Sequence, residues 1–170
     1  MSNPTSPQFS PALLSLEMLG MLPKDYTIRP LQLDDYDRGY LETLAELTTV
    51  GNITKDQFRE RFEWLQRRNE EYMCIVLYEH QTDRIVGSGN ILIERKFIHG
   101  CSSVGHIEDI VVSESLRGKG LGQWIIKQLT HIGTSMGAYK ILLACADTNV
   151  GFYKKCGFQP KEISMAIYNQ

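Results

Sequence analysis

The chain has 170 residues, a formal net charge of −2 at neutral pH and 42% hydrophobic residues, which fits one globular domain with a full core. The sequence pI of about 6.1 argues against a nucleic-acid partner, and no apolar run reaches the roughly 18 residues of a membrane span. The N-terminal residues lack the basic and apolar segments of a secretory signal.

The four cysteines are spread over the chain, at Cys74, Cys101, Cys145 and Cys156. None of them forms a CxxC pair, so a zinc site is not expected. They are typical of reduced thiols, and we therefore expect a cytoplasmic protein.

The first 25 residues differ from the rest and are expected to form a tail in front of one domain over 26–170. Prolines among polar residues predict disorder from Met1 to Pro11. The leucines between Leu13 and Leu22 predict one short helix. Docking of its apolar side on the domain is one interpretation, and weak contact with a membrane surface is the other, which would make the protein peripheral at endomembranes.

From Tyr26 onward, strands and helices follow each other closely. Alternating and β-branched runs predict strands at 26–30, 73–79, 84–95 and 106–112. Helical spacing predicts a helix at 33–47, with aspartates near its start, and a second one at 55–69, for which Thr54 is a good N-cap. Residues 96–103 are expected to be a loop.

The last third of the chain continues with a helix at 121–133, a strand at 140–146, a short helix at 149–156 and a final strand at 165–168. Gly157 closes the short helix from the position after its end. The order of elements is β-α-α-β-β-β-α-β-α-β. This order predicts an α/β fold, with a mixed, mostly antiparallel sheet flanked by helices.

A glycine-rich loop, Arg117-Gly-Lys-Gly-Leu-Gly122, lies between the strand at 106–112 and the helix at 121–133. Its glycines let a ligand approach the backbone, and the free N–H groups and dipole of the helix start attract anions. Arg117 and Lys119 add positive charge. The loop therefore predicts a site for a phosphate-bearing ligand, and the alternative is a tight turn that binds nothing. It matches neither a Walker loop nor the dinucleotide fingerprint, which requires glycine at Gln123.

The pattern Arg117-x-x-Gly120-x-Gly122 resembles the pyrophosphate loop of the GNAT superfamily of acyl-coenzyme A-dependent N-acyltransferases. The resemblance implies acetyl-coenzyme A as co-substrate, no metal, and two central strands that splay apart to hold the pantetheine arm. It implies these cofactor-binding residues: Ile110, Val111, Val112, Arg117, Gly118, Lys119, Gly120, Leu121, Gly122, Gln123, Ala144, Cys145, Ala146, Asn149 and Tyr153.

Four further segments, at 47–51, 93–99, 105–110 and 149–158, resemble one family of this superfamily, the glucosamine 6-phosphate N-acetyltransferases of UDP-N-acetylglucosamine biosynthesis. The resemblance implies a homodimer whose substrate site is completed across the interface. Alternatives are an N-acetyltransferase for another small amine or a protein N-terminus, and a non-catalytic acyl-coenzyme A-binding domain. The implied substrate-binding residues are Thr48, Lys96, Phe97, Ile98, His99, Glu108, Asp109, Ile110, Tyr139 and Lys140.

The catalytic residues implied by the resemblance are Glu108, Asp109 and Tyr153, with Glu108 orienting the amine and Tyr153 protonating the departing thiolate. Consecutive residues of a straight strand point to opposite faces, so both carboxylates reach one ligand only through a bulge or through backbone atoms. The alternative for the carboxylates is structural ion pairs. The alternative for Tyr153 is a core position beside Phe152 and Phe158.

Two positions depart from the family pattern. Ala144 stands where relatives commonly carry an acidic residue, which weakens any mechanism with a carboxylate as base. Tyr168 stands where relatives commonly carry an arginine for the sugar phosphate. Phosphate binding is then expected from Lys96, Lys140 and Arg29, or from the Tyr168 hydroxyl.

Overall fold

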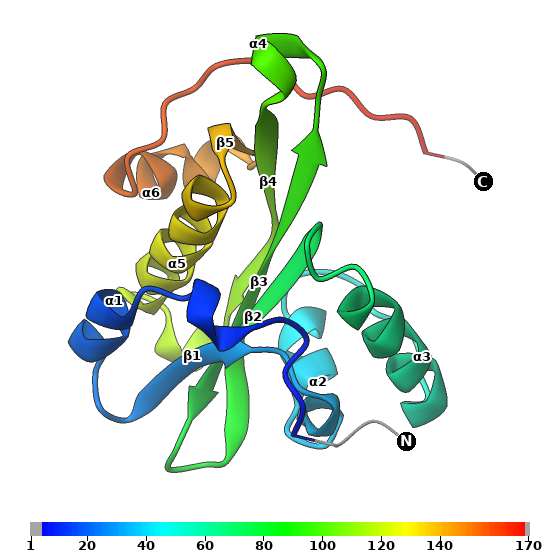
Figure 1. The fold of residues 1–170 in the computed structure, drawn as a ribbon. Helices are drawn as coiled ribbons and strands as arrows, with labels where there is room; N and C mark the ends of the chain where they lie inside the picture. The colour runs from blue at the N-terminus through cyan, green and yellow to red at the C-terminus, as the bar shows by residue number, and fades with distance from the viewer. Residues whose placement is uncertain (1–4, 169–170) are drawn as a thin grey trace.

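The computed structural model describes residues 5–168, and part of the predicted disordered tail, residues 1–4, lies outside it (Figure 1). Its centre is a five-stranded sheet in the order β1-β2-β3-β4-β5. Neighbouring strands are antiparallel except β4 and β5, which are parallel. The predicted mixed, mostly antiparallel sheet is confirmed. The strands are β1 (Tyr26–Pro30), β2 (Tyr72–Glu79), β3 (Arg84–Arg95), β4 (Ser103–Val112) and β5 (Ala138–Leu143).

Helices cover both faces of the sheet (Figure 1). Ile125 and Leu129 of α5 belong to a hydrophobic cluster on one face, and Phe58 and Phe62 of α3 belong to a second cluster on the other. The helices are α1 (Leu16–Met21), α2 (Tyr40–Ala45), α3 (Lys55–Gln66), α4 (Ile98–Cys101), α5 (Leu121–Ser135) and α6 (Val150–Lys155), with 3-10 turns η1 (Pro11–Leu13), η2 (Leu33–Tyr36), η3 (Glu114–Leu116) and η4 (Asp147–Asn149). Within residues 5–168, no helix is both long enough and apolar enough to cross a bilayer.

The predicted helix at 33–47 is wrong as a single element, because it is divided into η2 and α2. Gly39 separates the two with a left-handed backbone, φ +84°, and serves as the N-cap of α2. A Cβ atom at Gly39 would lie only 2.4 Å from the guanidinium of Arg84. The chain therefore turns here because glycine permits both the dihedral angle and the close contact.

The predicted last strand at 165–168 is also wrong for the single chain. After α6 the described residues form neither helix nor strand. Ile163, Met165 and Ile167 are each at least 90% exposed. A strand forms only when another strand accepts and donates its ladder hydrogen bonds, and no described strand pairs with this segment.

The prediction of disorder through Pro11 is wrong for residues 5–11. Gln8 and Phe9 are buried, and the Gln8 side chain bonds three backbone groups: Nε2 donates to Leu65 O (3.0 Å) and Tyr72 O (2.8 Å), and Cys74 N–H donates to Oε1 (2.9 Å). The composition of this segment is that of a disordered tail, but one buried amide attaches it to the sheet.

The docking interpretation of the leucine-rich helix is confirmed. Leu14 and Leu22, on either side of α1, are buried in the core. Gln128 of α5 accepts from Ser15 N–H at 2.9 Å and donates to Ser15 O at 3.1 Å. These bonds fix the start of α1 against α5.

Three glycines allow α5, β3, β4 and β5 to pack closely. A Cβ at Gly89 would lie 2.4 Å from Ile110 Cδ1, and a Cβ at Gly105 or Gly133 would lie 2.8 or 2.4 Å from Ile141 Cδ1. Real Cβ atoms do not approach that closely, so isoleucine side chains occupy the space where these glycines have no side chain.

We predict that Gln8→Ala lowers the free energy of unfolding by about 2 kcal/mol, because it leaves three buried backbone groups without a partner. Urea unfolding followed by circular dichroism measures this loss. Gln81→Ala, in the exposed β2–β3 turn, is the matched control and should be neutral. Equal stability of the two variants would show that the docked segment contributes nothing.

Candidate active site

The edge of β4 that faces β5 is paired over only part of its length. The parallel register runs from Ser103 opposite Ala138 to Ile107 opposite Leu143, where β5 ends. The β4 segment 108–112 therefore has no strand partner on that side among the described residues. The predicted splay of the two strands is confirmed, and β5 begins two residues earlier and ends three residues earlier than the predicted strand at 140–146. Ala144, Cys145 and Ala146 follow it as exposed residues.

A β-bulge interrupts β4 at the two carboxylates. The register with β3 changes from Asn90 opposite Glu108 to Ser88 opposite Val111. Asp109 has φ +54°, a left-handed conformation rare for a residue with a side chain. Asp109 is exposed like Glu108, so the bulge keeps both carboxylates out of the core.

The ion-pair interpretation of these carboxylates finds no support. Within the described part of the chain, no cationic group forms a salt bridge with Glu108 or Asp109. The one side-chain hydrogen bond recorded for them is from Asn90 Nδ2 to Asp109 Oδ2, at 3.0 Å. Both are thus free to accept from an amine or hydroxyl of a bound molecule.

The glycine loop has the backbone of an anion site. Gly118 and Gly120 have φ +82° and +78°, and Gly120 is the N-cap of α5. No carbonyl of the described residues accepts from the N–H groups of Gly120, Leu121 or Gly122. Since α5 is 15 residues long, its dipole and these free donors favour an anion at this end.

Arg117 lies at the same end of the site. Its Nε donates to Val112 O at 3.2 Å, and its NH2 group lies 3.7 Å from Glu46 Oε2. Glu46 also accepts from Glu114 N–H at 2.6 Å. One carboxylate at the end of α2 therefore holds both η3 and the arginine beside the loop.

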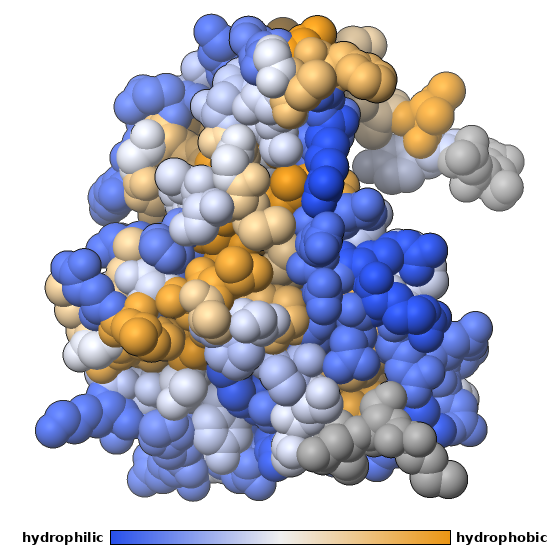
Figure 2. Space-filling view, in the orientation of Figure 1, coloured by the Kyte–Doolittle hydropathy of each residue, from blue (hydrophilic) through white to orange (hydrophobic). Residues whose placement is uncertain are grey.

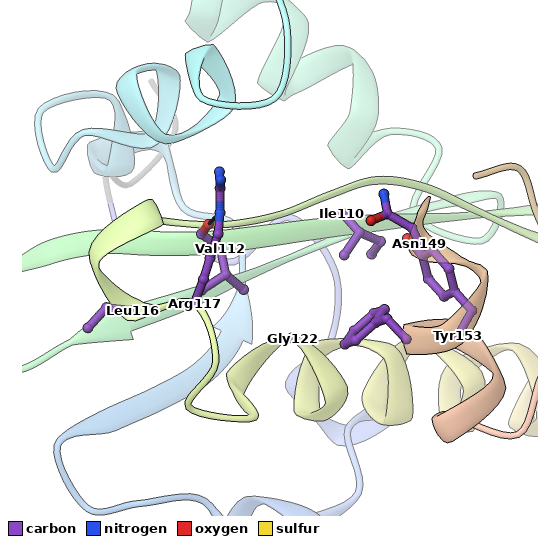
Figure 3. A pocket seen from close by; sticks show the side chains of 8 residues that line it. Ile110, Val112, Leu116, Arg117, Gly122, Asn149 and Tyr153 are labelled. Carbon is purple, nitrogen blue, oxygen red and sulfur yellow. Dashed lines mark hydrogen bonds between the residues drawn. The ribbon is translucent and has the colours of Figure 1, made fainter. Parts of the chain in front are cut away.

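A pocket of about 190 Å³ connects the loop to α6. Figure 3 shows Val112, Leu116 and Arg117 at one end of this pocket and Ile110, Asn149 and Tyr153 at the other. This volume is below the roughly 300–1,000 Å³ of sites that enclose a drug-sized molecule. It therefore suits one part of a longer ligand. Its lining residues are Ile110, Val112, Leu116, Arg117, Gly122, Asn149, Phe152 and Tyr153.

Tyr153 is both a packed aromatic residue and a pocket residue. Its ring makes edge contacts with Phe152 and Phe158, at centroid distances of 5.0 and 6.3 Å. Burial raises the pKa of the Tyr153 phenol, and the nearby Cys145, Cys156 and Glu108 raise it further. The phenol is therefore protonated at neutral pH and is a hydrogen-bond donor in the pocket.

The loop at 96–99 and the pair Tyr139–Lys140 lie together in one chain. The rings of His99 and Tyr139 have centroids 4.3 Å apart. Lys96 Nζ donates to Glu94 Oε1 at 2.6 Å, and His106 Nε2 lies 2.9 Å from Glu94 Oε2. Lys96 and His106 hold the pKa of Glu94 below its usual range. This cluster lies beside α4, where His99, Gly100 and Cys101 all have positive φ.

The chain alone does not bring Thr48 to this cluster. In Figure 1, α4 is at the top end of the β3–β4 hairpin, and α2, which precedes Thr48, is in the lower half. Figure 2 shows hydrophobic surface at the α4 end, where Phe97 and Ile98 are 93% and 59% exposed. The predicted substrate residues thus form two separate groups.

Arg29 is not available as a phosphate ligand, which corrects one of our expectations. It forms two hydrogen bonds with Asp35, at 2.8 and 2.7 Å, and Asp35 is completely buried. An arginine that neutralises a buried carboxylate cannot leave it without a large cost in free energy. Lys140, by contrast, lies 4.0 Å from the exposed Glu162 and 6.0 Å from the centroid of the Tyr139 ring, so no buried carboxylate holds it.

Several site residues could not be found from the sequence. Leu116 and Phe152 line the pocket but read as ordinary core residues. Glu46 bonds Glu114, which is 68 positions away in the sequence, and Glu94 bonds His106, which is 12 positions away. No sequence motif predicts pairs at these separations. As for metals, the described residues contain no group of three or more His, Cys, Asp or Glu side chains that could hold an ion.

Comparison with known proteins gives one consistent family. The profile described as "Acetyltransferase (GNAT) family" matches residues 32–158. The chain is 46% identical over 142 residues to glucosamine 6-phosphate N-acetyltransferase 1 of Dictyostelium discoideum, covering 84% of this chain and 90% of that one. It is 43% identical to the Candida albicans glucosamine 6-phosphate N-acetyltransferase, covering 85% and 97%.

A solved structure shares the fold as well. The crystal structure of glucosamine-6-phosphate N-acetyltransferase from Arabidopsis thaliana superposes with a TM-score of 0.84 at 37% identity. The match covers 85% of this chain and 99% of that one.

We predict that Gly122→Val weakens coenzyme A binding by about tenfold or more. A Cβ at Gly122 would lie 3.3 Å from Phe152 Cζ and 3.6 Å from Val112 Cγ2, so the valine methyl groups would occupy the pocket beside the free N–H groups. Calorimetric titration with coenzyme A measures the affinity. Gly120 is a poorer choice, because its φ of +78° strains any other residue.

Gly20→Val in α1 is the control for this experiment, since a Cβ there has nothing within 4 Å. It should bind coenzyme A as the wild type does. If a folded Gly122→Val variant binds coenzyme A with unchanged affinity, the interpretation of the loop as a phosphate site is wrong.

Proposed function

Since this chain belongs to the acetyltransferase (GNAT) family, we propose that it transfers the acetyl group of acetyl-coenzyme A to the amine of glucosamine 6-phosphate. The products are N-acetylglucosamine 6-phosphate and coenzyme A. The identity to relatives that carry this name, over most of the length of both chains, supports the choice of substrate. Reduced thiols at all four cysteines support a cytosolic location.

One observation carries the proposal: an unpaired edge of β4 extends between the glycine loop and the partly buried phenol of Tyr153. The first two residues of this edge are the free carboxylates Glu108 and Asp109. The edge is the segment 108–112 of β4, and the pocket along it joins Arg117 and Gly122 to Tyr153. Glu108 is near enough to Tyr153 to raise the pKa of the phenol. An acceptor for an amine and a donor for a leaving group therefore lie along the same strand edge.

The residues present fit acetyl-coenzyme A. The free N–H groups of Gly120, Leu121 and Gly122, together with Arg117, offer donors and positive charge for a pyrophosphate. The unpaired N–H and C=O groups of β4 offer a ladder to an amide-bearing arm, in the manner of strand addition. The thioester supplies an activated acetyl group, and the backbone groups and side chains around it bind and orient the two substrates.

Glu108 and Asp109 receive the amine in this proposal. Two acceptors without a cationic partner in the described chain hold and orient an ammonium or amine. The amine loses its proton to water or to a backbone carbonyl, so neither carboxylate is assigned as the sole base. Ala144, at a position where an acidic residue could assist, adds no further acceptor.

Tyr153 acts as the acid. As the carbon–sulfur bond breaks, its hydroxyl donates a proton to the sulfur that leaves. A raised pKa keeps this proton available through neutral pH. The unpaired N–H groups of β4 stabilise the negative charge that develops on the acetyl oxygen.

A thiol-release assay tests the proposed activity against its alternatives. We expect release of coenzyme A with glucosamine 6-phosphate, much slower release with glucosamine, and none with an N-terminal peptide. Preference for the peptide or for another amine would replace the substrate. Binding of acetyl-coenzyme A without release on any amine would leave a non-catalytic binding domain.

A homodimer completes the substrate site in this proposal. In one chain, α2, which Thr48 follows, lies far along the sheet from α4, beside which His99 contacts Tyr139 (Figure 1). The C-terminal segment passes α4 and leaves the domain, and its apolar side chains at 163, 165 and 167 alternate as in a strand. A second copy offers both the missing strand partner and the missing part of the site.

We predict that Tyr153→Phe lowers kcat by about 100-fold or more, with little change in either binding constant. The ring contacts with Phe152 and Phe158 remain, so only the proton is lost. Because burial raises the pKa of Tyr153 above that of an ordinary tyrosine, wild-type activity is not lost through deprotonation of this phenol at neutral or mildly alkaline pH. Steady-state kinetics from pH 6 to 10.5 measure both effects.

Tyr72→Phe, whose ring packs on Trp64, serves as the control and should keep wild-type kcat. If Tyr153→Phe retains kcat within about twofold while chemistry limits turnover, Tyr153 belongs to the core alone.

We predict that Ile163→Asp combined with Ile167→Asp converts the protein from a dimer to a monomer of 19.4 kDa. Both residues are at least 90% exposed in the single chain and lie on one side of an extended segment. Light scattering after size exclusion gives the mass. Ser164→Asp combined with Ala166→Asp places the same two charges on the opposite side and should leave the dimer intact. A wild-type monomer would refute the dimer.

A further inference from the structure

Asn90 of β3 contacts one of the two consecutive carboxylates and is paired in register with the other. It lies directly opposite Glu108 in the β3–β4 register. Residues paired in this way point to the same face, with Cβ atoms about 4.5–5.5 Å apart. Its Nδ2 donates to Asp109 Oδ2 at 3.0 Å. Asn90 therefore touches Asp109 while it shares a face with Glu108.

The residue that Asn90 holds is strained. Asp109 has a left-handed backbone, φ +54°, inside a strand, which a residue with a side chain adopts only at a cost in free energy. Gly89 on β3 provides the space, because Ile110 Cδ1 occupies the position of its absent Cβ. The space makes the bulge possible, and the hydrogen bond from Asn90 fixes where its carboxylate points.

The other end of the Asn90 amide is not satisfied. Its Oδ1 is buried and accepts no hydrogen bond within residues 5–168. A buried acceptor without a partner is unfavourable and requires a reason. Since Oδ1 makes no hydrogen bond, only the Nδ2 donor explains why an amide side chain stands at this position. Among the described residues, the acceptor for this donor is Asp109 Oδ2.

The surroundings on this face supply no countercharge for Asp109. Cys74 is the β2 residue opposite Asn90, and burial raises the pKa of its thiol to about 12. Burial raises the pKa of Tyr40 above its usual range, and its electrostatic interactions with Cys74 and Asp109 raise it further. Both groups are neutral at physiological pH. The Asp109 carboxylate therefore has no ion-pair partner on this face among the described residues.

We propose that Asn90 is a positioning residue of the acetyl transfer: it orients the Asp109 carboxylate beside Glu108, and the pair then receives the amino sugar. The proposal rests on the proposed function. Asn90 acts through Asp109 and does not itself contact the reacting atoms.

Asn90→Ala and Asn90→Asp test this role in the full-length protein. In Asn90→Ala, kcat/KM for glucosamine 6-phosphate falls about tenfold or more, while the KM for acetyl-coenzyme A changes less than twofold. The melting temperature stays equal or rises, because an unsatisfied buried oxygen is removed. A residue with a purely structural role would instead lower the melting temperature and leave the remaining folded enzyme with normal kinetics.

Asn90→Asp keeps the shape but replaces the donor by a second carboxyl group. Repulsion between it and Asp109 makes the pair hold a proton to higher pH. The acidic limb of kcat/KM for glucosamine 6-phosphate therefore moves upward by at least about 0.5 pH unit. Asn69→Asp, in the exposed turn after α3, adds the same charge elsewhere and should leave the limb in place.

The outcomes separate the two proposals. If the wild type acetylates glucosamine 6-phosphate and the kcat/KM of Asn90→Ala for this substrate lies within twofold of the wild-type value, only the role of Asn90 is overturned. Absence of wild-type turnover of this amino sugar overturns the proposed function and this role with it. A selective loss of amino-sugar kinetics in Asn90→Ala, with the shifted limb in Asn90→Asp, supports both.

Discussion

The site depends on one constraint: a central strand of the sheet has backbone groups that its neighbour does not pair. β4 separates from β5 after Ile107, so the segment 108–112 presents N–H and C=O groups on an open edge. Such groups are costly if they are buried and unpaired. A ligand with amides of its own can pair with them, and this turns an interrupted sheet into a binding surface. The glycine loop and Tyr153 then lie at the two ends of the same edge.

The bulge at Asp109 adds a second departure from a regular strand. A regular strand would direct one of two consecutive carboxylates into the core, where α5 packs. The left-handed residue avoids this, and Gly89 on the next strand leaves room for the displaced Ile110. Stability and function are therefore in conflict at this position. The fold accepts a strained residue and an unsatisfied amide oxygen in exchange for two carboxylates on the surface.

Local signals predicted most of the fold. The strands 26–30 and 84–95 have the predicted bounds, because a proline or a turn marks their ends and β-branched residues fill them. The glycine loop was predictable because its motif lies between a strand and a helix, and the splay was implied by the family resemblance. The division of the helix at Gly39 was not, since it depends on a contact with Arg84 from a distant strand. Gln8 was missed because a polar residue is assumed to face solvent. The strand predicted at 165–168 is absent because no described strand of the same chain pairs with this segment.

Gly89 and Gly105 beneath α5, and Gly133 within it, affect what the tolerance of this protein to substitutions reveals. A Cβ at Gly89, Gly105 or Gly133 would meet atoms at 2.4–2.8 Å, closer than the 3.3 Å at Gly122. The space that side chains at these three positions would fill belongs to isoleucine and leucine, not to a ligand. In a survey of natural or random variants, all four positions would be invariant. Invariance alone would therefore not distinguish a glycine required for packing from a glycine required for binding. The two separate only when affinity and folding yield are scored independently, since Gly122 affects the first and the other three the second.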